Sequence, residues 1–229
     1  MNPPFPFVGR KKERTQLCQL HKQCRHALIL GAAGVGKSAL VAHLRGTLPL
    51  VLCVPSETLG QICCNLEGEL HLSATLAPLV LRKNRLLKIL AEVGQTVVFD
   101  GMGWTTPKVS SFLESAMECA PVWICARSEH AADIGHFWPL LARFEKIELR
   151  PFHLSETNAL LAAAVETGQI SPSVALFARQ LQRLSAGLPL ALRELLEQFA
   201  TGHYDLSRRA GLQLLELDRH IKRLLPTVA

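Results

Sequence analysis

The feature that most constrains this chain is the loop from Gly31 to Ser38, which reads Gly-Ala-Ala-Gly-Val-Gly-Lys-Ser. The preceding segment, Ala27–Leu30, is a short apolar run typical of a buried strand, and Lys37 to Leu48 has the apolar spacing of a helix. Glycines let successive backbone N–H groups curl around a phosphate, and the following helix N-terminus adds the positive end of its dipole. A strand, this loop and a helix, in that order, predict a nucleotide-phosphate site.

The residue types in the loop suggest a role for each member. We expect Lys37 to bridge the β- and γ-phosphates of ATP, and the Ser38 hydroxyl to reach Mg²⁺. The other expected nucleotide contacts come from the loop and the start of the helix: Gly31, Ala32, Ala33, Gly34, Val35, Gly36 and Ala39. An ordinary glycine turn is the alternative, and it is disfavoured because Gly-Lys-Ser stands at the correct spacing.

A second acidic position follows a later apolar run, Thr96-Val-Val-Phe-Asp100. A strand that ends in Asp places a carboxylate beside the phosphate loop, where it can support the Mg²⁺ shell. A lone Asp after a strand is often only a helix cap or a turn residue, so this interpretation depends on the loop upstream. The sequence therefore predicts ATP and Mg²⁺ as ligands, with Ser38 and Asp100 on the metal.

Strands and helices alternate along the first part of the chain, up to a strand at Lys146–Leu149. Alternation of this kind predicts an α/β fold with a five-stranded parallel sheet between helices. After Pro151 only helical patterns follow. We expect a P-loop nucleotide-binding core over residues 1–150 and a small helical lid domain with a C-terminal helix over residues 151–229. The expected lid helices are Ser155 to Glu166, Ser171 to Ser185, Gly187 to Phe199 and Leu206 to Leu225.

Composition and charge narrow the setting. Hydrophobic residues make up 48% and charged residues 19%, a balance that argues against disorder. Seven cysteines scattered through helices and strands are typical of reduced thiols, and the N-terminus lacks the features of an export signal, so we expect a cytoplasmic protein that does not span a membrane. The net charge of +6 is compatible with nucleic-acid binding and equally with a solvated basic surface. The basic stretches are Arg10 to Arg25, Arg82 to Lys88 and Arg208 to Arg223.

Four further segments resemble the AAA+ superfamily, and more narrowly its STAND branch of signalling ATPases. They are Phe7–Arg10 with Glu13, Asp100–Trp104, Trp123–Ser128 and Gly187–Leu192. The resemblance implies that Val8, Gly9 and Arg10 lie beside the adenine, and that Pro189 packs near the base. It also implies that Arg127, at the end of the sensor 1 strand, responds to the γ-phosphate.

The segment Pro139–Phe144 resembles the stretch that carries an arginine finger in oligomeric AAA+ proteins, which makes Arg143 the candidate. A guanidinium from a neighbouring subunit neutralises charge that develops on the γ-phosphate. A surface arginine at a helix end is the alternative. A homo-oligomer is expected if the first interpretation holds.

Departures from the family pattern bear on activity. Gly101 stands where most active AAA+ ATPases have a Glu that polarises the attacking water, so slow hydrolysis is expected. Glu57 and Glu129 are possible substitutes, and Arg193 is the nearest candidate for sensor 2. The sequence ends at Ala229, which leaves no room for the winged-helix and repeat modules common in STAND proteins, so we expect a protein partner or self-assembly.

Two functions remain open. The first is an ATP-dependent assembly factor on double-stranded DNA, similar to the AAA+ ATPases that load helicases or regulate transposition. Its DNA-facing residues would be those of the basic stretch Arg82, Lys83, Arg85 and Lys88, through phosphate contacts. The second is a STAND-type ATP/ADP switch that engages a protein. A metabolite kinase is disfavoured because no acceptor lid is evident.

Two other groupings are interpreted as structural. Cys18, His21, Cys24 and His26 lie close in sequence but lack the spacing of a known zinc motif. Trp104, Trp123 and Trp138 are expected to pack in the core or in a switch region rather than to stack on bases.

Overall fold

The computed structural model describes residues 5–54, 56–73 and 77–200, and they form two units. Residues 10–150 form the core unit. The second unit combines residues 5–9 with residues 151–200, because Phe5 and Val8 pack against the apolar cluster of the helices after Pro151. The sequence-based division placed residues 5–9 with the core, and the structure differs there. A short apolar segment has no periodicity that would reveal which apolar cluster it packs against.

A five-stranded parallel sheet lies at the centre of the core unit, as the sequence predicts, in the spatial order β2-β3-β4-β1-β5. Strands β1, β3 and β4 are flanked on both sides, and their apolar residues are almost all fully buried. Burial on both faces explains why they appear in the sequence as continuous apolar runs. The strands are β1 (Ala27–Leu30), β2 (Leu50–Cys53), β3 (Thr96–Met102), β4 (Val122–Ala126) and β5 (Glu145–Glu148).

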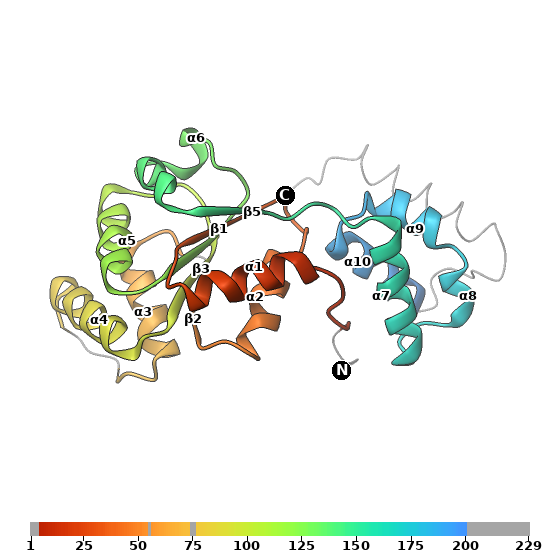
Figure 1. The fold of residues 1–229 in the computed structure, drawn as a ribbon, viewed down its shortest axis with the longest axis horizontal. Coiled ribbons are helices and arrows are strands. Elements are labelled where there is room, and N and C mark those ends of the chain that lie inside the picture. Colours follow the sequence, from red (N-terminus) through yellow and green to blue (C-terminus); the bar gives the residue numbers. More distant parts are fainter. Residues whose placement is uncertain (1–4, 55, 74–76, 201–229) are drawn as a thin grey trace, which may run out of the picture. The chain divides into compact units, whose positions relative to one another are not determined.

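Helices cover both faces of this sheet (Figure 1). One side carries α1 (Lys11–Lys22) and α2 (Lys37–Arg45). The other carries α3 (Leu59–Glu69), α4 (Leu79–Val93) and α5 (Pro107–Cys119). These three helices, with the short elements α6 (Ala131–Ile134) and η1 (Trp138–Arg143), bury their apolar faces in one large cluster against the strands.

Helix boundaries in the core follow local capping chemistry. Helix α3 begins after Thr58, whose side chain accepts a hydrogen bond from the backbone N–H of Gln61 while the Gln61 side chain returns to the Thr58 N–H. Helix α2 ends at Arg45, short of the predicted Leu48, and its C-cap residue Gly46 keeps a right-handed helical conformation. The capping box therefore fixes the start of α3 independently of the apolar pattern.

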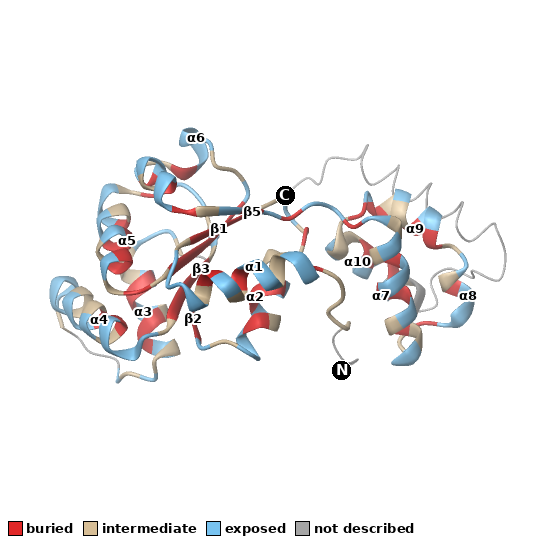
Figure 2. Ribbon diagram, viewed as in Figure 1, coloured by how far each residue is buried: buried red, intermediate tan, exposed pale blue. Residues whose placement is uncertain are grey.

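The second unit is helical over its described residues after Pro151. Its elements are α7 (Leu154–Glu166), α8 (Pro172–Ala175), α9 (Ala178–Ser185) and α10 (Pro189–Ala200). They enclose a second apolar cluster, so buried residues recur on the inner side of each helix (Figure 2). The single helix predicted from Ser171 to Ser185 is wrong, because the chain turns at Leu176 and Phe177 between α8 and α9.

Two sequence predictions concern the far end of the chain. The expected helix from Leu206 to Leu225 and the basic stretch from Arg208 to Arg223 lie outside the described residues. Among the residues that are described, none of the helices combines the length and the apolar character that a bilayer crossing requires.

Candidate functional site

The phosphate loop connects β1 to α2, and its glycines are required by geometry. Gly36 has φ of 100° at the N-cap of α2, a value that a residue with a side chain rarely adopts. At Gly31 the limit is space: an added Cβ would stand 2.7 Å from the Leu149 carbonyl oxygen and 2.8 Å from Val35 Cγ1. The loop is thus held tightly against the end of β5, where the Leu149 N–H donates to the Leu30 carbonyl at 2.7 Å.

Lys37 is the first residue of α2, and its side chain folds back over the loop. Its Nζ donates to the carbonyl oxygens of Gly31 at 2.6 Å and Ala32 at 3.0 Å. Partial burial lowers the pKa of Lys37, and the positive charge of Arg127 lowers it further, while the Asp100 carboxylate opposes both effects. The net effect disfavours the ammonium, so a negatively charged ligand at this position would stabilise it.

Asp100 and Arg127 belong to the same neighbourhood because of the strand order. Asp100 lies near the carboxyl end of β3, and Arg127 follows β4, which lies between β3 and β1. The carboxyl ends of parallel strands meet at one edge of a sheet, so both residues join Lys37 there. The Asp100 carboxylate also acts on buried Cys125: burial raises the pKa of that thiol well above its ordinary value, and Asp100 adds to the effect. Nothing in the sequence pattern singles out Cys125.

The backbone explains why glycine follows Asp100. Pairing between β3 and β4 is interrupted between Phe99 and Met102, and Gly101 in this interruption has φ of 66°. A Glu at this position would carry the strain of a left-handed backbone conformation. Of the proposed substitutes, Glu129 is ion-paired with Lys146 on β5, and Glu57 is exposed just before α3.

The three residues expected beside adenine fall in two different units. Val8 packs in the apolar cluster of the second unit, and a Cβ on Gly9 would stand 3.0 Å from a carboxylate oxygen of Glu156 in that unit. Arg10 belongs to the core unit, where its guanidinium is buried and donates to the carbonyl oxygen of Val35 at 3.0 Å. Arg10 thus contacts the phosphate loop through a backbone carbonyl, a role that the sequence does not indicate.

Arg143 lies at the last position of η1, separated from β5 by Phe144, and donates to Glu118 on α5 at 2.7 Å. Since Glu145 pairs with Ala27, Arg143 stands at the edge of the sheet where β1 begins, whereas the phosphate loop follows the other end of β1. A four-residue strand separates these edges by roughly 13 Å. Arg143 therefore stands on the side of the core unit away from its own phosphate loop.

Comparison with known proteins was informative for structures only. A scan against protein-family models found no match, and a search of curated proteins found no significant one. The ORC1 protein of Aeropyrum pernix in complex with DNA matches with a TM-score of 0.64 and 16% identity, over 98% of this chain and 70% of that one. Cdc6p of Pyrobaculum aerophilum matches with a TM-score of 0.60 and 14% identity, over 84% of this chain and 60% of that one. A STAND protein with a tetratricopeptide repeat sensor, from Pyrococcus horikoshii, matches with a TM-score of 0.53 and 19% identity. The match covers 83% of this chain and 30% of that one.

At these TM-scores the likeness concerns the overall fold. The chain has the AAA+ P-loop ATPase fold. Identities this low establish a fold and nothing finer, and this chain spans 60% of the Cdc6p chain and 30% of the STAND protein. Activity and partners are therefore treated as proposals below.

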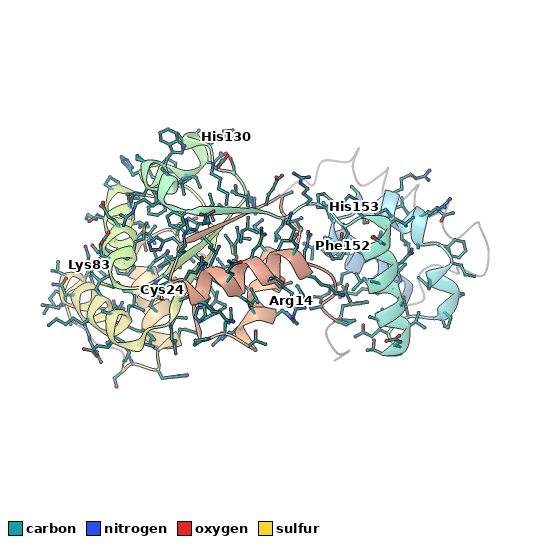
Figure 3. The ribbon with its side chains drawn as sticks, in the orientation of Figure 1. Arg14, Cys24, Lys83, His130, Phe152 and His153 are labelled. Carbon is teal, nitrogen blue, oxygen red and sulfur yellow. The ribbon has the colours of Figure 1, made fainter. Side chains whose placement is uncertain are left out.

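The basic face of α4 differs from the sequence prediction at Arg82. Its Nε and Nη2 donate to the two carboxylate oxygens of buried Glu67 on α3, at 2.9 Å and 2.5 Å. This bond lowers the pKa of Glu67 and raises that of Arg82. Arg82 therefore joins two helices of the core unit and is not displayed for DNA. Arg85 and Lys88 are exposed. Lys83, which Figure 3 labels, is partly exposed on the same helix.

Only one of the three tryptophans lies in the core, which is one of the two expected settings. Trp123 is fully buried in β4, but 58% of Trp104 and 49% of Trp138 are exposed. Trp104 meets the ring of His136 edge-on at 5.9 Å. Beneath it, buried Thr105 donates through its hydroxyl to the Ile134 carbonyl at 2.6 Å and accepts from the Phe137 N–H at 3.0 Å. The loop after β3 is thus tied to the segment that leads into η1 and Arg143.

In the second unit, the Gly187–Leu192 segment comprises the end of the turn after α9 and the start of α10. Gly187 has φ of 70°, and an added Cβ would stand 2.5 Å from the carbonyl oxygen of Phe152, which Figure 3 labels. Pro189 opens α10, so its ring starts a helix as the sequence implies. Arg193, the sensor 2 candidate, is exposed and donates to Glu197 one turn later at 2.7 Å.

The two histidines of the Cys18–His26 grouping form hydrogen bonds with strands of the sheet. His21 Nδ1 lies 2.8 Å from the Thr96 hydroxyl, and His26 Nδ1 accepts a hydrogen bond from the Val122 N–H at 3.0 Å. Within residues 5–54, 56–73 and 77–200, no cluster of three metal-ligating side chains occurs. The oxygens of Ser38 and Asp100 still fit Mg²⁺, because this ion prefers hard oxygen ligands and retains several waters.

Proposed function

We propose that this chain binds ATP with Mg²⁺, hydrolyses it slowly, and acts as a nucleotide-dependent, oligomerising assembly factor on DNA. The observation that supports the ATP-dependent part most strongly is the meeting of Lys37, Asp100 and Arg127 at the sheet edge that carries the phosphate loop. A cation on the loop, an acidic residue for the metal and a second cation match the parts that phosphoryl transfer requires.

The proposed roles follow from the chemistry of each group. Backbone amides of the loop and the N-terminus of α2 bind the phosphates, and Lys37 exchanges its loop carbonyls for phosphate oxygens. Ser38 and Asp100 hold Mg²⁺, which neutralises charge on the β- and γ-phosphates when bound. Arg127 lies close enough to Lys37 to influence its charge, and so to respond to the γ-phosphate.

Slow turnover follows from Gly101. Gly101 has the left-handed backbone conformation found where the β3–β4 pairing is interrupted. It has no side chain, so this position provides no carboxylate that could activate water. ATP then acts mainly as a switch. Assembly is proposed because Arg143, at the opposite sheet edge, could contribute to hydrolysis only at the site of a neighbouring subunit.

Melting of the protein with and without ATP and Mg²⁺ tests nucleotide binding. At about 100 times Kd, ATP should stabilise the fold by roughly 2.7 kcal/mol. Lys37→Ala should lose most of this stabilisation, whereas Lys22→Ala, which changes an exposed lysine on α1, should keep it. Equal stabilisation of both variants would remove the basis for the phosphate site.

DNA is the proposed partner because the chain is basic, because α4 exposes Arg85 and Lys88, and because one structural neighbour is an ORC1 protein in complex with DNA. Binding should be largely independent of DNA sequence. The logarithm of the binding constant should fall linearly with the logarithm of the salt concentration, with a slope of about −0.9 per phosphate contact. Replacing Arg85 and Lys88 by Ala should reduce the slope by up to roughly two units. Lys11→Ala with Lys22→Ala is the charge-matched control on α1.

A STAND-type switch that engages a protein is the second candidate. The hydrogen bonds of Thr105 favour it, because they join the loop after Asp100 to the segment before Arg143 and so connect two parts of the proposed machinery. This candidate predicts no DNA binding at low salt, even with ATP and Mg²⁺. It predicts instead that ATP and ADP give different protease-cleavage patterns around Trp104.

A further inference from the structure

The buried guanidinium of Arg10 joins three segments that lie far apart in sequence. Its Nη2 donates to the carbonyl oxygen of Val35 in the phosphate loop at 3.0 Å and to that of Arg150 at 2.6 Å. Its Nη1 is ion-paired with Glu13 at 3.4 Å. Only 5% of Arg10 is exposed, so these bonds form where water competes little.

The bond to Val35 bears on how the loop presents its amides. The peptide between Val35 and Gly36 is trans, so its carbonyl and its N–H point in opposite directions. Because Arg10 holds the Val35 carbonyl on one side of the loop, the Gly36 N–H is directed to the other side. Gly36 is among the residues expected to cradle phosphate, and Arg10 thus fixes the orientation of one of those donors.

The bond to Arg150 bears on the second unit. The chain passes between the two units at two places, from Gly9 to Arg10 and from Arg150 to Pro151. Arg10 is itself the N-cap residue of α1, held at φ of 57°, and Pro151 restricts Arg150 to extended conformations. One side chain therefore ties both connections to the phosphate loop.

We propose that Arg10 couples phosphate binding at the loop to both connections between the core unit and the helical unit. This rests on the proposed ATP function and assigns Arg10 a positioning role, in place of the adenine contact that the sequence suggests. Phosphate that engages the Gly36 amide fixes the Val35 peptide, which fixes the guanidinium and, through it, the Arg150 carbonyl. Coupling of this kind is reciprocal, so a partner that shifts the helical unit would alter nucleotide affinity.

The test compares Arg10→Lys with wild type, using ATP and inorganic tripolyphosphate, each with Mg²⁺. Lysine keeps the charge but lacks the planar fork that reaches both carbonyls and Glu13. Affinity for both ligands should fall by a similar factor of about ten. Hydrogen exchange at residues 8–10 and 149–153 should slow when wild type is saturated with ATP, and should change little in saturated Arg10→Lys. Arg45→Lys, which alters an ion pair with Glu69 elsewhere in the core unit, is the matched control.

Each other result has a distinct meaning. A loss of ATP affinity with unchanged tripolyphosphate affinity would assign Arg10 to the base and overturn the coupling role. Wild-type exchange behaviour in Arg10→Lys would overturn it as well. Wild type that binds neither ligand would instead refute the proposed ATP function. If circular dichroism shows Arg10→Lys to be unfolded, Glu13→Gln replaces it, and behaviour identical to wild type in both measurements then contradicts the proposal.

Discussion

Two arginine–glutamate pairs in the core unit contain residues that the sequence marks as functional, and the structure places them in opposite environments. Arg82 and Glu67 join α4 to α3, with their side chains 16% and 5% exposed. Arg143 and Glu118 join η1 to α5, with their side chains 43% and 66% exposed. The covered pair fixes two helices, whereas the exposed pair costs little to break and leaves its guanidinium available to another molecule. In these two pairs, burial separates a structural arginine from a candidate arginine finger.

Loss of Arg143 should give the largest effect, and in activity. An arginine finger contributes roughly 10³-fold or more to phosphoryl transfer. Arg143→Ala should therefore reduce ATP turnover by about that factor under conditions that favour oligomers, while nucleotide affinity and melting temperature stay near wild type. Steady-state turnover, measured alongside size-exclusion chromatography, checks this. Wild-type turnover and assembly in the variant would make Arg143 an ordinary surface charge.

Loss of Arg82 should act on stability instead. Arg82→Ala leaves the Glu67 carboxylate covered and without its partner, which should lower the free energy of unfolding by about 2 kcal/mol. The pair lies just beneath the surface, so a larger loss is not expected. Urea denaturation gives the value, and the double variant Arg82→Leu with Glu67→Leu is the control, because removing both charges should restore part of the loss. A loss no greater than that in Arg143→Ala would remove the contrast between the pairs.

The smallest expected effect is on the pH dependence of stability, through His26 beside the exposed Arg143–Glu118 pair. Partial burial lowers the pKa of His26 below 6.5, Arg143 lowers it further, and Glu118 opposes both. Because the unfolded chain then binds a proton more readily, stability should fall as the pH drops from about 6.5 through the lowered value. Arg143→Ala should raise the pKa of His26 and reduce this loss, whereas Arg82→Ala should leave it unchanged. NMR titration of the His26 ring in the three proteins decides the matter.

Much of the fold was predictable because strands that are buried on both faces of a sheet appear in the sequence as continuous apolar runs. Ala27–Leu30 and Val122–Ala126 are continuous apolar runs, and their bounds agree with the structure. The phosphate loop was predictable for a different reason: the geometry of a close turn admits only glycine at Gly31 and strongly favours it at Gly36. In both cases a local constraint selects the residue type.

The roles of Arg10, Arg82 and Trp104 could not be predicted from sequence. Arg10 reaches carbonyl oxygens 25 and 140 residues away, and a backbone carbonyl is the same whatever side chain it carries. Arg82 meets Glu67 only because α3 and α4 pack together. Periodicity also gives no sign that Trp104 is largely uncovered, since an aromatic residue after a strand is more often buried.

The position of β1 in the sheet has a consequence for how the chain folds during synthesis. Ala27 is paired with Trp123 on one side and with Glu145 on the other, so both neighbours of β1 emerge about a hundred residues after it. Pairing over such separations is slow, because a long loop must close before any contact is gained. At about 5–20 residues per second, the ribosome needs several seconds to supply β4 after β1. A nascent fragment that ends before Val122 should therefore contain all of Gly31–Ser38 and still bind no nucleotide, so ATP can stabilise the core only after β4 has been made.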